Sequence, residues 1–255
     1  MNTQSSPSSL HLISTLTLCA ILSAGCSSTG GESKSSSAAS PAPTAGSAPA
    51  SGPGFAVRYK ADDGRTIEIG KATAADGGWR FKDPHMEKCW VAEDFRFTGI
   101  DTLYIAPTLV TAKYNKDEEK VLQLAKENIP VELERSLRSK NIFAHVVTRE
   151  ADIPTGVKMV KLENTIVEFS KGGGGARFFA GLYGAGQPVL RVQGKMTDGD
   201  KTVFTFEARR SGTSAGARMS GGYQKDEDIQ IEDIRSMTLD LTDFMAALSG
   251  KYQAK

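Results

Sequence analysis

Cysteine is scarce in this sequence, and its scarcity excludes one class of secreted protein. The 255 residues contain three cysteines, Cys19, Cys26 and Cys89. A small domain held together by disulfides needs an even set, so a hydrophobic core must stabilise this chain instead. A disulfide bridge between Cys26 and Cys89 is possible unless the Cys26 sulfur is acylated.

Histidine is equally scarce, which argues against a metal or catalytic centre. None of the three histidines, His11, His85 and His145, has a second histidine or a cysteine at the spacing of a metal-binding pair. Cys89 has no activating partner in the sequence, and the carboxylates of Glu168 and Asp198 are not placed in one cleft. We therefore expect no catalytic residue, no metal, no cofactor and no enzymatic activity.

A large excess of charge of one sign is also missing. The chain has 31 Lys and Arg against 30 Asp and Glu, a formal net charge of +1. A dedicated nucleic-acid-binding protein normally has a basic excess, so nucleic acid is not an expected partner. The charge is uneven, however, because residues 171–218 carry eight bases and three acids.

The first 25 residues lack Lys and Arg, and they read as a leader peptide. The uncharged run from Leu10 to Ala24 is shorter than the roughly 20 apolar residues of a spanning helix. Small residues precede the cysteine in Leu22-Ser23-Ala24-Gly25-Cys26, a pattern typical of bacterial lipoproteins, although Leu usually stands where Ser23 does. We predict a signal peptide over 1–25 and acylation of Cys26, palmitate included. An ordinary secretory peptide is the alternative.

Residues 26–54 are mostly Ser, Ala, Pro and Gly, with few charges. Such a segment cannot bury enough apolar surface to fold, and it predicts a disordered linker with a span of about 30 Å. Acyl chains on Cys26 would anchor the protein in a lipid bilayer. Since no Asp follows Cys26, we expect the periplasmic leaflet of the outer membrane.

Hydrophobic periodicity divides the remainder into an N-terminal hairpin extension, 55–99, and a globular domain, 100–255. Strands are predicted at 55–60 and 66–70, 103–106, 142–147 and 157–169, the last with a bulge between Leu162 and Val167. The clearest hairpin alternates over 190–196 and 204–208 around a turn at 197–200. Helices are predicted from about Asp117, interrupted or kinked at Pro130, and over 231–248, capped by Asp226 or Asp228. The predicted class is α+β, a mainly antiparallel sheet with both long helices on one face.

Several segments resemble a family of bacterial lipoproteins known as domain of unknown function 4410. The matching pieces are 102–107, 141–143, 165–169 with Gly172, 181–186, 196–199 and 240–248. The resemblance implies an envelope lipoprotein with no assigned catalytic residue. The layout is more distantly similar to lipoproteins that activate peptidoglycan synthases or form the curli export channel, and no functional residue is carried over from them.

The segment from Gly172 to Gly186 is the best candidate for binding. It contains seven glycines, but their spacing is wrong for a dinucleotide fingerprint, and a strand follows it. Aromatic and basic side chains in such a segment suit a membrane surface or a protein partner. The candidate residues are Arg177, Phe178, Phe179, Leu182 and Tyr183, extended by Arg209 and Arg210. In the alternative, these aromatic side chains pack inward.

These observations predict a non-enzymatic envelope lipoprotein that binds a protein or a cell-wall component. One alternative is a subunit of an oligomeric envelope or export assembly, in which the glycine-rich segment is a contact between copies. A second alternative is an unrecognised hydrolase that acts on the wall or on a polysaccharide.

Overall fold

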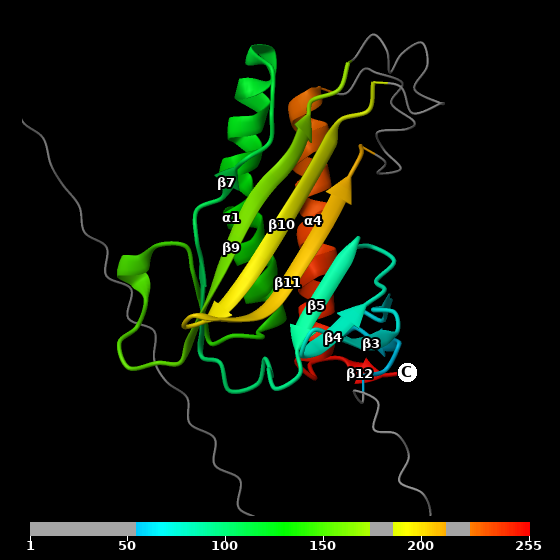
Figure 1. Ribbon diagram of the computed structural model, residues 1–255, viewed down its shortest axis with the longest axis vertical. Helices are drawn as coiled ribbons and strands as arrows, with labels where there is room; N and C mark the ends of the chain where they lie inside the picture. Colours follow the sequence, from blue (N-terminus) through cyan, green and yellow to red (C-terminus); the bar gives the residue numbers. More distant parts are fainter. Residues whose placement is uncertain (1–54, 174–185, 213–224) are drawn as a thin grey trace, which may run out of the picture. The chain divides into compact units, whose positions relative to one another are not determined.

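A computed structural model of the protein describes residues 55–173, 186–212 and 225–255, which belong to one folded unit, Pro49–Lys255. Two long helices and two sheets make up the described part of this unit (Figure 1), which confirms the predicted α+β class. The predicted leader, Cys26 and the whole predicted linker lie outside the described residues.

The larger sheet has nine strands within the described residues, and most of its pairings are antiparallel. In spatial order the strands are β3 (Ala72–Ala75), β4 (Gly78–Phe81), β5 (Lys88–Ala92), β11 (Lys201–Arg210), β10 (Val189–Asp198), β9 (Met159–Ser170), β6 (Thr102–Ile105) and β8 (His145–Val147), with β7 (Leu109–Val110) also beside β9. Among the strands that the structure describes, the pairs β6–β8, β6–β9 and β7–β9 are parallel and the other pairs are antiparallel.

The predicted central hairpin and the predicted bulge are both confirmed. β10 and β11 pair along their whole length and meet at a two-residue turn in which Gly199 has a φ of 57°. In β9, Ile166 lies opposite Val192 while Glu168 lies opposite Arg191, so Val167 is the extra residue. The bulge therefore lies where the apolar side of the strand changes.

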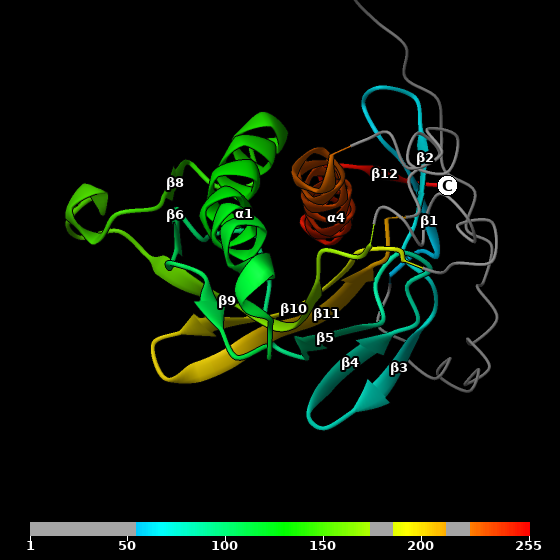
Figure 2. The ribbon, with the colours of Figure 1, turned by 90° about the horizontal axis from the view of Figure 1, so that it is seen from above.

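Both long helices cover the same face of the large sheet (Figure 2), as predicted. α1 spans Glu119–Lys140 and continues through Pro130, which does not split it, after a short 3-10 turn, η1 (Lys116–Glu118). α4 spans Asp226–Leu248. The predicted cap is wrong, because Lys225 is the N-cap residue and Asp226 and Asp228 fall in the first turn, where the helix dipole favours them.

The two helices run in the same direction, side by side. Lys120 contacts Glu227 near their first turns, Arg235 contacts Glu132 midway, and Lys140 contacts Asp243 near their ends. Beneath them the core is rich in phenylalanine, and the ring of Phe244 packs on those of Phe81 and Phe204.

The segment 55–99 contributes to both sheets. β1 (Arg58–Lys60) and β2 (Thr66–Glu68) form the predicted hairpin, and the C-terminal strand β12 (Gln253–Ala254) pairs with β1 to complete a small sheet. β3, β4 and β5 instead extend the large sheet, where β5 pairs with β11. A second 3-10 turn, η2 (Glu150–Asp152), lies between β8 and β9.

Candidate functional site

The predicted binding segment begins and ends at a close approach of two backbone stretches. Gly173 donates its amide hydrogen to the carbonyl oxygen of Gly186 at 2.9 Å, and Gly172 has a φ of 75°. A Cβ atom on Gly172 would collide with that same carbonyl oxygen, so only glycine fits there. The five candidate residues between these points, Arg177, Phe178, Phe179, Leu182 and Tyr183, lie outside the described residues.

The structure does not bring the other two candidates, Arg209 and Arg210, to one face. They are neighbours on β11, so their side chains point to opposite sides of the sheet. Arg209 is exposed and lies 3.5 Å from the carboxylate of Glu168. Arg210 is nearly buried and donates to Asp240 at 2.6 Å and to the carbonyl oxygen of His85 at 2.8 Å. Arg210 is therefore bound within the fold.

Buried polar side chains fasten the backbone where β9 and β11 end. The carboxylate of Glu118 accepts the amide hydrogen of Lys171, just after β9, at 3.1 Å. The Gln230 amide donates to the carbonyl oxygen of Ser170 at 3.3 Å. Just after β11, Asp233 accepts the amide hydrogen of Gly212 at 2.9 Å. The turn η1 before α1 and the N-terminal part of α4 thus fix the ends that lead into 174–185 and 213–224.

Asp233 is the most perturbed of these groups. Its side chain is buried in α4, and burial raises its pKa from 3.8 to about 6. The hydrogen bond from Gly212 and the positive charge of Arg210 oppose this rise, while the charge of Glu232 adds to it. The folded protein therefore keeps Asp233 protonated up to a higher pH than an exposed aspartate, and its neutral form predominates only below about pH 6.

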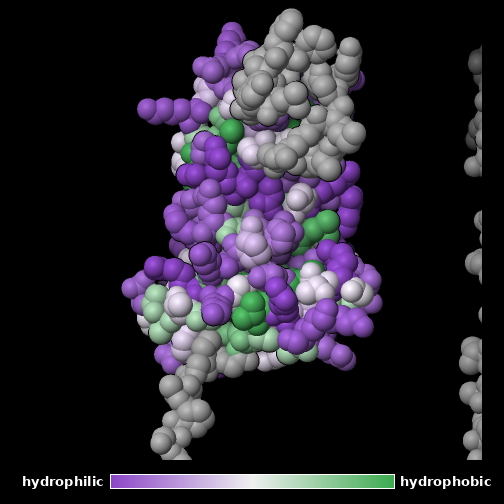
Figure 3. All heavy atoms as spheres, turned by 90° about the vertical axis from the view of Figure 1, so that its right-hand side faces the viewer, coloured by the Kyte–Doolittle hydropathy of each residue, from purple (hydrophilic) through white to green (hydrophobic). Residues whose placement is uncertain are grey.

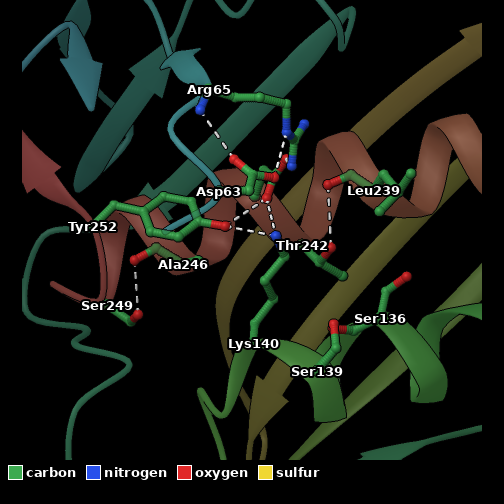
Figure 4. Close-up of polar contacts among 11 residues, drawn as sticks. Asp63, Arg65, Ser136, Ser139, Lys140, Leu239, Thr242, Ala246, Ser249 and Tyr252 are labelled. Atoms are coloured by element: carbon green, nitrogen blue, oxygen red, sulfur yellow. Dashed lines mark hydrogen bonds and ion pairs between the residues drawn. The ribbon is translucent and has the colours of Figure 1, made fainter. Parts of the chain in front are cut away.

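A second buried acid, Asp243, joins four separate parts of the chain. Its carboxylate receives the Lys140 ammonium at 2.5 Å, the Tyr252 hydroxyl at 2.6 Å and the Arg65 guanidinium at 3.1 Å. Figure 4 shows these three donors converging from α1, from the C-terminal segment and from the turn before β2. Arg65 is itself oriented by Asp63, 2.6 Å from its Nε atom.

The shifts in pKa follow from this geometry. Burial and the neighbouring Asp243 raise the pKa of Tyr252. Burial alone would lower the pKa of Lys140, but the hydrogen bonds to Asp243 and Tyr252 outweigh it and the pKa is raised. Lys140 is thus held in its charged form at the end of α1.

Sequence reasoning missed both buried acids, although a signal exists. Asp233 and Asp243 lie beside Ile234 and Phe244, inside the apolar stripe of the predicted last helix. An acid within such a stripe is rarely fully buried unless it is paired. Their partners, however, come from distant parts of the sequence, and no local spacing names them.

The remaining candidates stay apart. His85 and His145 are exposed, and Cys89 is buried with a pKa raised well above its ordinary value by burial. Glu168 lies opposite Arg191 on β10, and Asp198 follows seven residues later, about 23 Å along the strand. Within the described ranges, no three His, Cys, Asp or Glu side chains are grouped to hold a metal. None of the helices described is long and apolar enough to cross a membrane.

Three solved structures are similar to parts of this chain. No curated protein matches the chain. The PelC dodecamer from Paraburkholderia phytofirmans is similar over 57% of this chain and 92% of its own, at 14% identity and a TM-score of 0.35. A DUF330 protein from Xanthomonas campestris is similar over 62% and 89%, at 11% identity and a TM-score of 0.37. A putative neuraminyllactose-binding hemagglutinin homolog from Helicobacter pylori is similar over 58% and 84%, at 6% identity and a TM-score of 0.30.

A family model also matches the central part of the chain. It covers residues 92–216, from the end of β5 through α1 and the β10–β11 hairpin. The resemblance inferred from the sequence is therefore confirmed for this segment: residues 92–216 match the family described as domain of unknown function (DUF4410).

Proposed function

We propose that this protein is a non-enzymatic lipoprotein of the bacterial cell envelope, tethered through Cys26, which binds a protein or a cell-wall component through the end of the fold that bears 174–185. The observation that carries the proposal is the separation of two ends along α4. The strand ends that lead into 174–185 and 213–224 contact its first turns, through Gln230 and Asp233.

Phe55, the first residue that the structure describes, lies toward the C-terminal end of α4. The ring of Phe55 is 5.4 Å from that of Phe81, which packs at 5.1 Å on Phe244, near the end of α4. Asp233 and Phe244 are eleven residues apart, about 16 Å along the helix. Figure 1 shows β12 and the ends of β9 and β11 at opposite ends of the large sheet. A linker that enters beside Phe55 would leave the binding end directed away from the membrane.

A fixed base also suits recognition. Binding residues are commonly carried on loops that a rigid scaffold positions. Here the backbone on both sides of 174–185 is fastened by Glu118 and Gln230 and by the contact between Gly173 and Gly186. Side chains such as Phe178 and Phe179 would then be presented from a well-defined place.

The anchor is tested by changing Cys26 to Ser in cells that make the protein. We expect the variant to move from the membrane fraction to the soluble fraction, because an unacylated chain loses about 0.8 kcal/mol of membrane affinity for each methylene that no longer inserts. Fractionation and the mass of the mature chain measure this. Cys19→Ser, within the predicted leader, is the matched control and should stay membrane-bound. A Cys26→Ser protein that still sediments with membranes would disprove the anchor.

The binding end is tested by replacing Phe178 and Phe179 together with Ala. Crosslinking in intact cells, followed by capture, should recover about tenfold less of the partner, since aromatic anchors at an interface often contribute more than 1 kcal/mol each. The control is Leu109→Ala with Tyr114→Ala, two exposed apolar residues elsewhere. Equal capture by all three proteins would remove this end as the binding surface. Recovery of copies of this chain alone would favour an oligomeric assembly.

A further inference from the structure

An acidic groove follows the outer side of α4, and the proposed function does not use it. Two cavities of about 770 and 330 Å³ share Arg65 and Asp240 as lining residues and so form one groove. The larger is lined by one face of the helix, from Asp228 to Asp240. The smaller lies between α4, β2 and the turn around Asp83 and His85. Figure 3 shows a side of the unit that is mostly hydrophilic, with small hydrophobic patches.

The charged residues that line the groove are mainly acidic. The bases are Arg65 and Arg235, with His85, and the acids are Glu68, Asp83, Asp228, Glu232, Asp240 and Asp243. Burial raises the pKa values of Asp83 and Asp240. The charge of Asp240 adds to the rise at Asp83, and the charge of Asp243 adds to the rise at Asp240, while Arg210 and His85 oppose the rise at Asp240. Bringing a positive charge into the groove would relieve this repulsion.

Two apolar side chains lie between these acids on the same face of the helix. Leu239 is 43% exposed, and Ile231 is half-buried. They are eight residues apart, slightly more than two helical turns and about 12 Å. Large apolar side chains that remain exposed inside a groove can act as anchors for a bound segment.

The chain itself already places an arginine on an acid of the smaller cavity. The Arg65 guanidinium lies 3.1 Å from the Asp243 carboxylate, although half of the Arg65 side chain is exposed. The planar guanidinium matches a carboxylate well, and it is the side chain most often used for such pairs at interfaces. An arginine from another chain would meet the same chemistry further along the groove at Asp228, because Asp240 already receives Arg210.

We propose that this groove binds a basic, partly apolar peptide segment of a partner protein, with Lys or Arg side chains on its carboxylates and an apolar side chain on Leu239 and Ile231. The inference rests on the groove's charge and shape. It depends neither on lipid at Cys26 nor on residues 174–185, so it can fail or succeed separately from the proposed function.

The test uses the full-length protein, purified in detergent, and a short synthetic peptide rich in Arg, Lys and Leu. Calorimetric titration should show binding that weakens as salt is added, and no binding of the same peptide with Glu in place of each base. The double variant Asp228→Asn and Leu239→Ser should bind the basic peptide about tenfold more weakly, which corresponds to about 1.4 kcal/mol.

The matched control removes one acid and one exposed apolar residue from the other long helix. Glu119→Gln with Val131→Ser has the same change of charge, and both residues are exposed on α1. We expect this control to bind as the unchanged protein does. Equal weakening by both double variants, or equal affinity for the basic and acidic peptides, would overturn the proposal. So would a groove variant that loses only self-association, because the occupant would then be a second copy.

Discussion

Replacing Asp243 with Ala is expected to lower the free energy of unfolding by about 3–5 kcal/mol, because it leaves a buried cation without its partner. The Asp243 side chain is 3% exposed, and the Lys140 ammonium that contacts it is 16% exposed. Tyr252 and Arg65 lose their acceptor in the same step. Urea denaturation followed by circular dichroism at neutral pH measures the loss.

Two further variants separate this effect from a general loss of charge. Asp152→Ala breaks the exposed ion pair with Arg149 and should cost no more than about 1 kcal/mol. Changing Asp243 to Leu together with Lys140 to Met removes both charges, and it should cost less than Asp243→Ala alone. If Asp243→Ala costs no more than Asp152→Ala, the carboxylate is not a structural centre.

The ion pairs around Asp243 show that the folded unit extends beyond residues 92–216, which match the family. Lys140 lies within residues 92–216, whereas Arg65, Asp243 and Tyr252 lie outside them. The hydrophobic core also includes residues outside this segment, since Met237 and Leu241 of α4 are fully buried. The helix and the N-terminal hairpin therefore complete a core that the matched segment leaves open on its helical face.

Local patterns predicted the parts of the fold that depend on neighbours in sequence. The β10–β11 hairpin alternates over 190–196 and 204–208 and has a glycine at its turn, and the bulge at Val167 is visible as a change in the apolar side of β9. β3 escaped notice because Ala72–Ala75 has little β-propensity and no alternation. The parallel pairing of β6 with β8 and β9 was equally hidden, because such pairing depends on contacts between segments far apart in the chain.

The candidate site was less predictable than the fold. Alternation would have separated Arg209 from Arg210, since Ala208 is buried and Arg210 shares its face of the strand. The basic composition of this stretch suggests one face for both arginines only when the period of the strand is ignored. Asp243 could not have been matched to Lys140 and Tyr252, because nothing in the spacing of these residues specifies that they meet.

Asp233 is expected to make the stability of the protein depend on pH. Its pKa is about 6 in the folded protein and 3.8 without the fold, so between these values the folded state binds more protons than the unfolded state. Stability should therefore fall as the pH rises through this window, by about 3 kcal/mol in all, and the loss should be complete above about pH 6. Asp233→Asn carries no charge and should lack this contribution.

The measurement is urea denaturation of the unchanged protein and the variant from about pH 4 to about pH 7.5. Because this range begins just above the unfolded pKa of 3.8, the difference between their free energies of unfolding should move by about 2–2.5 kcal/mol in favour of Asp233→Asn as the pH rises. Asp233→Ala should show the same movement but a lower stability throughout, by about 1–3 kcal/mol, because the Gly212 amide hydrogen loses its acceptor. Parallel pH profiles for all three proteins would mean that burial does not shift this carboxyl. Two variants with the same pH dependence and different offsets would instead assign separate effects to the charge and to the hydrogen bond that fastens the end of β11.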